Sequence, residues 1–406
     1  MANVSSSNGL EKYPKLRFSG FNEQWNESKL SACFAKNIKK NTDGSISNVI
    51  CNSAKMGLIP QRDYFDKDIA NSDNTSGYYI IEHNDFVYNP RKSSDAPYGP
   101  ISRYAYPDAG IVSPLYLCFR ANGGVDTNFF EWYFRSSVWH RYIYMTGDSG
   151  ARHDRVSIKD DDFFSMPIRF PSATEQKKIA AFLNIVERRI TSQQLLVDNL
   201  KKYKRGLLHE ILCEKIKVTK SVWNVHKIGD YLDSKNIKQL PTPDAPLMAF
   251  TATGGVCDKG ERYDRGFLVK DASTKLYKRT DLNDFIYSSN NLDVGSIGLN
   301  LYGSSVISDV YEIFSISGAD PWFISEAIQQ KSVLHQILKY RQGCLYGQYR
   351  IYAEDFLEVS IRVPPLEAQK QIGTIFSRIE YRIKSEQALL DNLERAKTFF
   401  LQQLFI

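Results

Sequence analysis

The chain has 406 residues, with 52 Lys and Arg against 46 Asp and Glu, giving a net charge of +6 at pH 7. This length exceeds the roughly 250–300 residues at which one hydrophobic core stops growing, so at least two domains are expected. A hydrophobic content of 42% excludes a disordered chain, and no apolar run of about 18 residues indicates a transmembrane helix. The first ten residues do not resemble a signal peptide, and the six cysteines stand singly, so a cytoplasmic protein is expected.

The first 169 residues are predicted to form a mixed α and β domain. Tyr78–Tyr88 is rich in β-branched and aromatic residues between polar ones, which predicts a strand. Pro and Gly mark loops at Asn89-Pro90 and at 97–100, and 128–139 has a helical pattern. The acidic run 160–162 is interpreted as a charged loop rather than a metal site.

A long helix is predicted to follow over residues 170–213. Apolar residues with heptad spacing predict a coiled-coil seam, and about 40 residues would span roughly 60 Å. Pro171 precedes the helix, and Ser172 with Glu175 fits a capping box. The apolar seam positions are Ile179, Leu183, Val186, Ile190, Val197, Leu200, Leu207 and Ile211.

The second half of the chain repeats this plan, with a globular part over 214–362 and a helix over 363–406. Shifted by 193 positions, Pro171–Cys213 aligns with Pro364–Ile406 with 15 identities in 43 positions. The strand-like segment Asn84–Tyr88 also returns as Asn283–Tyr287, within a predicted strand 276–287. A helical pattern covers 322–338. The second helix has its apolar seam at Ile372, Phe376, Ile379, Ile383, Leu390, Leu393, Phe400 and Leu404.

The two long helices are expected to pair as an antiparallel coiled coil with a pseudo-twofold axis. The fold class is therefore α+β, with two mixed α/β globular domains separated by two long helices that arise from an internal duplication. One register would set Lys204 against Glu386 and Gln193 against Lys397, whereas full overlap of the helices favours a register about two heptads away. Helices packed only on their own domains are the alternative.

Sequence signatures of catalysis are missing. There is no phosphate-binding loop, no nuclease-like carboxylate cluster and no methyltransferase motif, and Asp320-Pro321-Trp322-Phe323 fits a turn that leads into a helix. The six histidines form no metal-binding pair. The sequence therefore predicts a binding protein rather than an enzyme, with no metal site and no cofactor bound by this chain.

Double-stranded DNA is the ligand that the loop residues favour. Arg and Lys suit phosphates and guanine edges, Asn and Gln suit adenine edges, and Tyr can stack or position phosphates. The candidates gather in two clusters, one in each globular part. The predicted DNA-binding residues are Arg62, Arg91, Lys92, Arg103, Tyr104, Arg152 and Arg155 in the first part, and Lys259, Arg262, Lys275, Lys278, Arg279, Asn290, Asn291, Arg341, Gln348, Tyr349 and Arg350 in the second.

Three features resemble the specificity subunit of type I restriction–modification enzymes. They are the duplicated Pro-x-x-x-x-Gln-Lys-x-Ile start of each helix, the Asn-Asp-Phe-(Val/Ile)-Tyr strand, and the segment from Pro14 to Trp25. The resemblance covers nearly the whole chain. It implies two target recognition domains, at 1–169 and 214–362, and two conserved spacer helices, at 170–213 and 363–406.

The resemblance also implies the partners. Each recognition domain would read one half of an asymmetric, bipartite DNA site, and the helices would set the gap. Two methyltransferase subunits would bring S-adenosylmethionine, and restriction–translocase subunits would bring Mg and ATP, so the chemistry would belong to the partners. A specificity chain for a fused methyltransferase–nuclease, a stand-alone DNA-binding regulator and a coiled-coil adaptor without DNA affinity remain alternatives.

Overall fold

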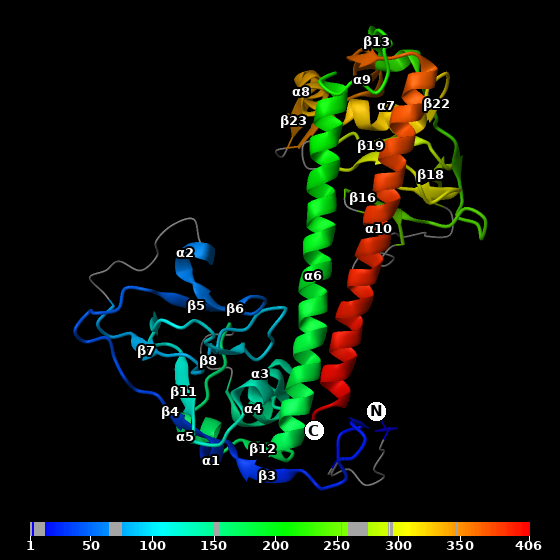
Figure 1. The fold of residues 1–406 in the computed structure, drawn as a ribbon. Coiled ribbons are helices and arrows are strands. Elements are labelled where there is room, and N and C mark those ends of the chain that lie inside the picture. Colours follow the sequence, from blue (N-terminus) through cyan, green and yellow to red (C-terminus); the bar gives the residue numbers. More distant parts are fainter. Residues whose placement is uncertain are drawn as a thin grey trace. The chain divides into compact units, whose positions relative to one another are not determined.

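The computed structural model describes residues 2–3, 13–64, 75–148, 154–252, 254–258, 275–290, 292, 295–345 and 348–406. The chain forms two compact units: unit 1 comprises 1–193 with 389–406, and unit 2 comprises 194–388. Two long helices, α6 (Ala173–Leu212) and α10 (Leu366–Gln403), contribute to both units. They are the long green and the long orange-to-red helices of Figure 1. Each unit therefore contains one globular region and a part of each long helix.

Unit 1 is built on a four-stranded antiparallel sheet with the order β4-β11-β8-β9. The smaller antiparallel pairs are β1–β2, β3–β12, β5–β6 and β7–β10. The strands are β1 (Ala2–Asn3), β2 (Leu16–Arg17), β3 (Asn26–Lys29), β4 (Phe34–Lys36), β5 (Ile50–Ser53), β6 (Gly57–Pro60), β7 (Tyr79–Ile81), β8 (Phe86–Tyr88), β9 (Ile101–Arg103), β10 (Gly110–Val112), β11 (Leu117–Ala121) and β12 (Pro167–Phe170). The helices are α1 (Leu30–Cys33), α2 (Gln61–Tyr64), α3 (Thr127–Arg135), α4 (His140–Thr146) and α5 (Asp160–Phe164).

Unit 2 has its own four-stranded antiparallel sheet with the order β14-β22-β19-β20. The strands are β13 (Asn224–Lys227), β14 (Leu232–Ser234), β15 (Lys238–Gln239), β16 (Ala249–Thr251), β17 (Gly255–Cys257), β18 (Tyr277–Thr280), β19 (Phe285–Ser288), β20 (Ile297–Leu299), β21 (Ser305–Ile307), β22 (Tyr311–Ile316), β23 (Gln342–Leu345), β24 (Gln348–Arg350) and β25 (Ser360–Val363). The helices are η2 (Ile228–Asp230), α7 (Pro321–Ile328), α8 (Lys331–Ile337), η5 (Leu338–Tyr340) and α9 (Ala353–Leu357).

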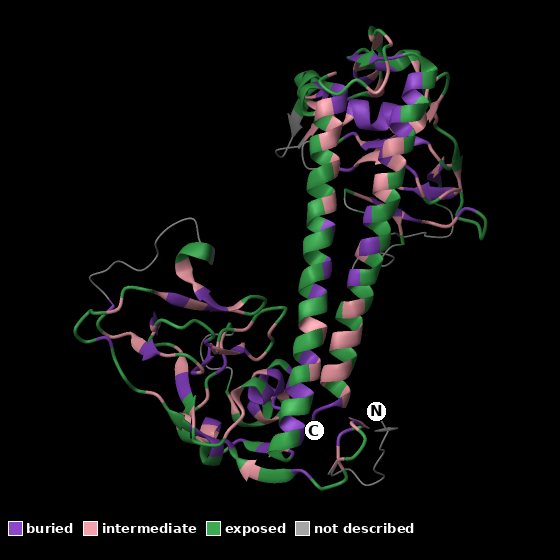
Figure 2. Ribbon diagram, viewed as in Figure 1, coloured by how far each residue is buried: buried purple, intermediate pink, exposed green. Residues whose placement is uncertain are grey.

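The two units follow the same plan, which agrees with the predicted duplication and the predicted fold class. The β3–β12 pair of unit 1 corresponds to β13–β25 of unit 2, and the two four-stranded sheets match strand for strand. Each sheet is followed by a helix that an aspartate caps, because Asp126 and Asp320 each accept a backbone N–H of the first turn. The purple residues of Figure 2 include the buried faces of α3 and α7, which pack into the two cores.

Several predicted elements are divided by turns. The strand expected at 78–88 is β7 and β8, and the strand at 276–287 is β18 and β19. The separating turns place Asn84 at φ 73° and Asn283 at φ 68°, a left-handed conformation that asparagine tolerates. The helix predicted at 322–338 is likewise divided into α7 and α8. Residues 160–162 were expected in a loop, but they form the first turn of the short helix α5. Three carboxylates suit this position because the N-terminus of a helix carries a partial positive charge.

The repeated motif at the start of each long helix has a structural reason. The side-chain amide of Gln176 donates to the carbonyl of Pro171 at 2.8 Å, and Gln369 donates to Pro364 at 2.9 Å. These bonds fix the chain where a strand turns into a helix. The carboxylate of Glu175 accepts two hydrogen bonds from Arg17, at 2.8 and 2.7 Å.

Within each unit, α6 and α10 run antiparallel, as predicted. In unit 1, Glu187 pairs with Lys397, and in unit 2, Lys204 pairs with Glu380. Both predicted polar pairings are wrong. Lys204 contacts Glu380, nearly one heptad before Glu386, and Lys397 contacts Glu187 rather than Gln193. The heptad pattern defines which face of each helix is buried, but charged side chains beside the seam set the register.

Candidate nucleic-acid interface

The predicted DNA-binding residues fall in three groups. Arg152, Lys259, Arg262 and Asn291 lie outside the described residues, and the side chain of Gln348 is likewise not described. Others are exposed at loops or strand ends. A third group is buried or occupied by internal contacts. The contacts of these residues differ between unit 1 and unit 2.

A hollow in unit 1 brings three predicted residues together. It measures about 730 Å³ and is lined by residues 51–56, 89–93, 95, 100, 113, 115, 116 and 155. Arg91 and Arg155 form an antiparallel bridge and lie directly opposite one another. Lys92 follows on the same segment, and its backbone N–H donates to the carbonyl of Asp154 at 2.8 Å. We call this feature the Arg91–Arg155 hollow.

Two other candidates of unit 1 are occupied inside the fold. Arg103 donates to Glu131 at 2.8 Å and to Asn84 at 2.6 Å, and its side chain is 15% exposed. Tyr104 is fully buried, and its hydroxyl donates to the carbonyl of Asp108 at 2.9 Å. We therefore correct both assignments, because these side chains are engaged in building the domain. Arg62 is exposed on α2.

Acidic partners occupy several cations of unit 2. Lys278 is buried and binds Glu312 at 2.9 Å, so it cannot contact DNA in this fold. Arg350 is exposed but shares the same carboxyl group, at 3.0 Å. Arg279 pairs with Asp281 at 3.1 Å. The pKa of Asp281 is also shifted. Burial acts to raise it, but hydrogen bonds from Arg279, Lys235 and Ser304 outweigh burial and hold the pKa well below its ordinary value.

The remaining candidates of unit 2 lie at its surface. Arg341 stacks over the ring of Tyr349, with 5.0 Å from the guanidinium carbon to the ring centre, and donates to the carbonyl of Leu338. Lys275 lies over Tyr277 at 5.4 Å. Asn290 is exposed and forms a bridge with Arg350. These residues present flat, cationic surfaces that suit phosphates and bases.

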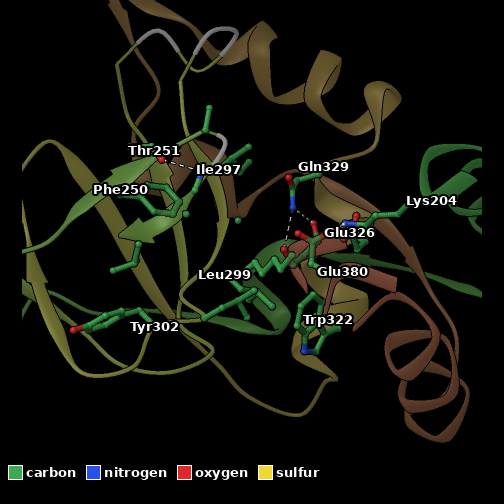
Figure 3. A pocket seen from close by; sticks show the side chains of 18 residues that line it. Lys204, Phe250, Thr251, Ile297, Leu299, Tyr302, Trp322, Glu326, Gln329 and Glu380 are labelled. Atoms are coloured by element: carbon green, nitrogen blue, oxygen red, sulfur yellow. Dashed lines mark hydrogen bonds and ion pairs between the residues drawn. The ribbon is translucent and has the colours of Figure 1, made fainter. Parts of the chain in front are cut away.

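A cavity of about 440 Å³ separates part of the unit 2 globule from the long helices. Figure 3 shows Lys204 of α6 beside Glu326 of α7 and Glu380 of α10 at one end of it, with Trp322 and Leu299 on the wall. The Lys204 ammonium lies 2.6 Å from Glu326 and 2.9 Å from Glu380. One lysine thus joins α6 to both α7 and α10.

The pKa values of two groups beside this cavity are raised. Burial alone acts to lower the pKa of Lys204, but the adjacent carboxylates of Glu326 and Glu380 raise it. Burial raises the pKa of Glu326, and Lys204 offsets this only in part. The site is therefore an internal ion cluster. Its contacts join α7 of the unit 2 globule to α6 and α10.

Unit 1 has an equivalent but differently charged junction. Lys397 binds Glu187 at 2.9 Å, and Arg135 of α3 approaches the same carboxyl group at 3.5 Å. Arg135 also pairs with Glu131 at 2.7 Å, which in turn binds Arg103. Here two cations share the helix carboxylate, whereas in unit 2 two carboxylates share the helix lysine.

Charge patterns missed two groups of residues. Tyr116 and Asn52 line the Arg91–Arg155 hollow but belong to no basic run. The Lys204–Glu380 and Lys397–Glu187 pairs were also missed, although both residues of each pair are identical between the two copies. Comparison of the copies position by position could have found them.

The described residues contain no group of three or more His, Cys, Asp and Glu side chains arranged for a metal ion. No described helix has the length and apolar character needed to cross a membrane.

The long helices expose several large apolar side chains. They are Ile185, Leu195, Leu196 and Tyr203 of α6, and Tyr381, Leu389 and Phe399 of α10.

Comparisons with known proteins agree with this arrangement. Residues 223–395 match the model of the type I restriction modification DNA specificity domain. The fold resembles the type I restriction–modification S subunit from M. genitalium, with a TM-score of 0.62, 14% identity, and coverage of 97% of this chain and 99% of that one. A structure described under complex assembly and conformational transition of the type I R-M system matches at a TM-score of 0.52 and 15% identity, with 94% and 97% covered. A search of curated protein sequences gave no significant match. The predicted resemblance is confirmed.

Proposed function

We propose that this chain, which carries a type I restriction–modification DNA specificity domain in a specificity-subunit fold, selects the DNA sequence for such a complex. Each recognition domain reads one half of an asymmetric, bipartite site. The long helices set the distance between the halves. The proposed boundaries are 1–169 and 214–362 for the recognition domains, and 170–213 and 363–406 for the spacer helices.

The duplicated plan of the two units supports this function most strongly. Both units carry the same strand order and the same capped helix, yet their loop charges differ. A shared scaffold with different loops suits two readers of different sequences, because base contacts come from individual side chains while the scaffold only positions them. Two different half-sites make an asymmetric site.

The partners follow from the same function. We infer two methyltransferase subunits, which bind S-adenosylmethionine, and restriction–translocase subunits, which use Mg and ATP, all in the cytoplasm. The apolar side chains exposed on α6 and α10 support docking of proteins along the helices, since exposed apolar residues favour protein interfaces. The chain itself contributes recognition and assembly.

Selection of bound DNA tests the proposal. The full chain is co-expressed with the methyltransferase encoded beside it, and the complex selects duplexes from a random library. The expected product is a bipartite sequence with a fixed gap. A continuous palindrome contradicts the proposal, and tight sequence-specific binding by the purified chain alone supports a stand-alone regulator instead.

A further inference from the structure

We propose that the Arg91–Arg155 hollow of unit 1 binds a DNA phosphodiester and holds the adjoining deoxyribose or base on its apolar wall. This inference rests on the proposed function and adds to it a defined backbone contact in one recognition domain. The hollow has the size of a small-ligand site, at about 730 Å³. Its lining contains four cations, Lys55, Arg91, Lys92 and Arg155, against one carboxylate, Asp95.

The opposed arginines indicate an anion between them. Arg91 and Arg155 are bridge partners across two antiparallel segments, and like charges directly opposite each other are destabilising. Asp154 lies 3.9 Å from Arg91, which is too far for a hydrogen bond. The Nε atom of Arg155 is buried and has no hydrogen-bond partner. A phosphate bound between the two arginines would neutralise both guanidinium groups.

The backbone around the arginines is fixed before any ligand arrives. Val156 donates to the carbonyl of Pro90 at 2.9 Å, and Lys92 donates to Asp154 at 2.8 Å, so the two segments stay paired. The side chain of Asn89 accepts the backbone N–H of Arg91 at 3.1 Å. Binding therefore costs little ordering of the main chain, which favours affinity.

The other wall of the hollow suits a sugar or a base. Leu115 and Met56 are 58% and 61% exposed, and Tyr116 adds an aromatic ring to the same lining. Burial raises the pKa of Tyr116 even though Arg91 and Arg155 act to lower it, so the phenol stays neutral and can donate a hydrogen bond. Cationic and aromatic groups together are typical of nucleic-acid contacts.

Unit 2 lacks a comparable set among its described residues. There, Glu312 neutralises Lys278 and Arg350, and Asp281 neutralises Arg279. The described cations of the two units therefore have different surroundings.

Salt dependence of DNA binding tests the hollow. The full chain in complex with its methyltransferase subunits is measured on a non-specific duplex at several salt concentrations, as wild type, Arg155→Gln, Arg91→Gln and the double variant. We expect the slope of log affinity against log salt to fall by about 0.9 for each phosphate that a variant no longer neutralises, and affinity near 0.1 M salt to fall roughly tenfold. An unchanged slope in the double variant overturns the proposal.

Two controls separate this effect from misfolding and from removal of charge anywhere on the surface. Arg141→Gln removes an exposed cation on α4 outside the hollow, and it should leave the slope unchanged. Arg155→Lys keeps the charge and should keep the slope. A drop of the same size in Arg141→Gln overturns the assignment, because the effect would then be general.

Neutral methylphosphonates identify the source of the phosphate. Placed singly along the duplex that the complex selects, they should weaken wild-type binding at one position of one half-site, and Arg155→Gln should abolish the penalty at that position alone. Millimolar AMP should bind the hollow only in competition with DNA. Arg155-dependent AMP binding to the DNA-saturated complex overturns the DNA assignment in favour of a free nucleotide.

The non-specific assay separates failure of this inference from failure of the proposed function. If the complex selects no bipartite sequence, the proposed function fails, although the slope can still be measured. If the complex selects a bipartite sequence but the hollow variants keep the wild-type slope, only the inference fails.

Discussion

Lys397 of α10 binds Glu187 of α6 at 2.9 Å, and the equivalent residues of the other copy, Lys204 and Glu380, are joined at the same distance. In each unit the lysine of one copy therefore contacts the glutamate of the other copy. The duplication by itself gives both helices the same apolar seam. The two reciprocal ion pairs specify how the seam of α6 aligns with that of α10. The register of the helix pairing is thus specified twice.

The two lysines should differ in their contribution to stability. Lys204 is 19% exposed and serves two carboxylates, so Lys204→Met leaves both without a partner and should cost about 3 kcal/mol of unfolding free energy in unit 2. Lys397→Met breaks a more exposed pair and should cost about 1 kcal/mol or less. Hydrogen exchange of the α6 and α10 amides measures both. Equal effects of the two substitutions would show that burial does not set their contribution.

Glu326 should be dispensable at neutral pH. Because its folded pKa is raised, its favourable contribution exists at low pH and is lost as pH rises through the folded pKa. Glu326→Gln removes the free-energy cost of keeping a buried carboxyl group ionised at pH 7, and it leaves Lys204 paired with Glu380. The thermal midpoint at pH 7 should therefore stay unchanged or rise. The measurement is thermal unfolding of the full chain at pH 7. A loss as large as that of Lys204→Met would mean that Glu326 is a net stabilising partner.

Asp281 should give unit 2 an acid-sensitive contribution. Its folded pKa lies below the ordinary value of 3.8, so the stabilisation is present above about pH 4 and is lost as pH falls toward the folded pKa. Asp281→Asn should lower the thermal midpoint at pH 7, and the difference from wild type should shrink between pH 4 and pH 2. Scans at pH 7, 4 and 3 test this. A difference that is constant with pH argues against ionisation as the cause.

A buried ion pair should anchor the N-terminal strand β2 to the start of α6. The side chains of Arg17 and Glu175 are 4% and 1% exposed and are joined by two hydrogen bonds. Arg17→Met leaves a buried carboxylate alone and should cost about 3 kcal/mol, while replacing both with Met and Leu should recover much of the loss. Urea unfolding followed by tryptophan fluorescence measures both. If the double replacement is no better than the single one, packing rather than charge explains the loss.

Local patterns predicted the parts of this fold that depend on neighbours in sequence. The heptad positions predicted both long helices, and the repeat predicted two copies of one plan. The turns at Asn84 and Asn283 were missed, although each asparagine is followed by an aspartate within a polar stretch that is typical of turns.

The candidate interface was harder to predict because charge partners are distant in sequence. Arg103 is occupied by Glu131, 28 positions away, and Lys278 by Glu312, 34 positions away. Neither sequence segment reveals the distant carboxylate that each cation binds. Arg91 and Arg155 were both predicted as DNA-binding residues, which stays a prediction, and the fold rather than the sequence pattern brings them opposite one another.

Mapping of N6-methyladenine tests the central claim most directly. The chain and its neighbouring methyltransferase are expressed in a host without this system, and methylated sites are mapped across the genome. Our account predicts one asymmetric motif in two parts with a fixed gap, whose sequence changes in one half only when a single recognition domain is exchanged. A continuous palindromic motif, or one that changes in both halves after that exchange, would contradict it.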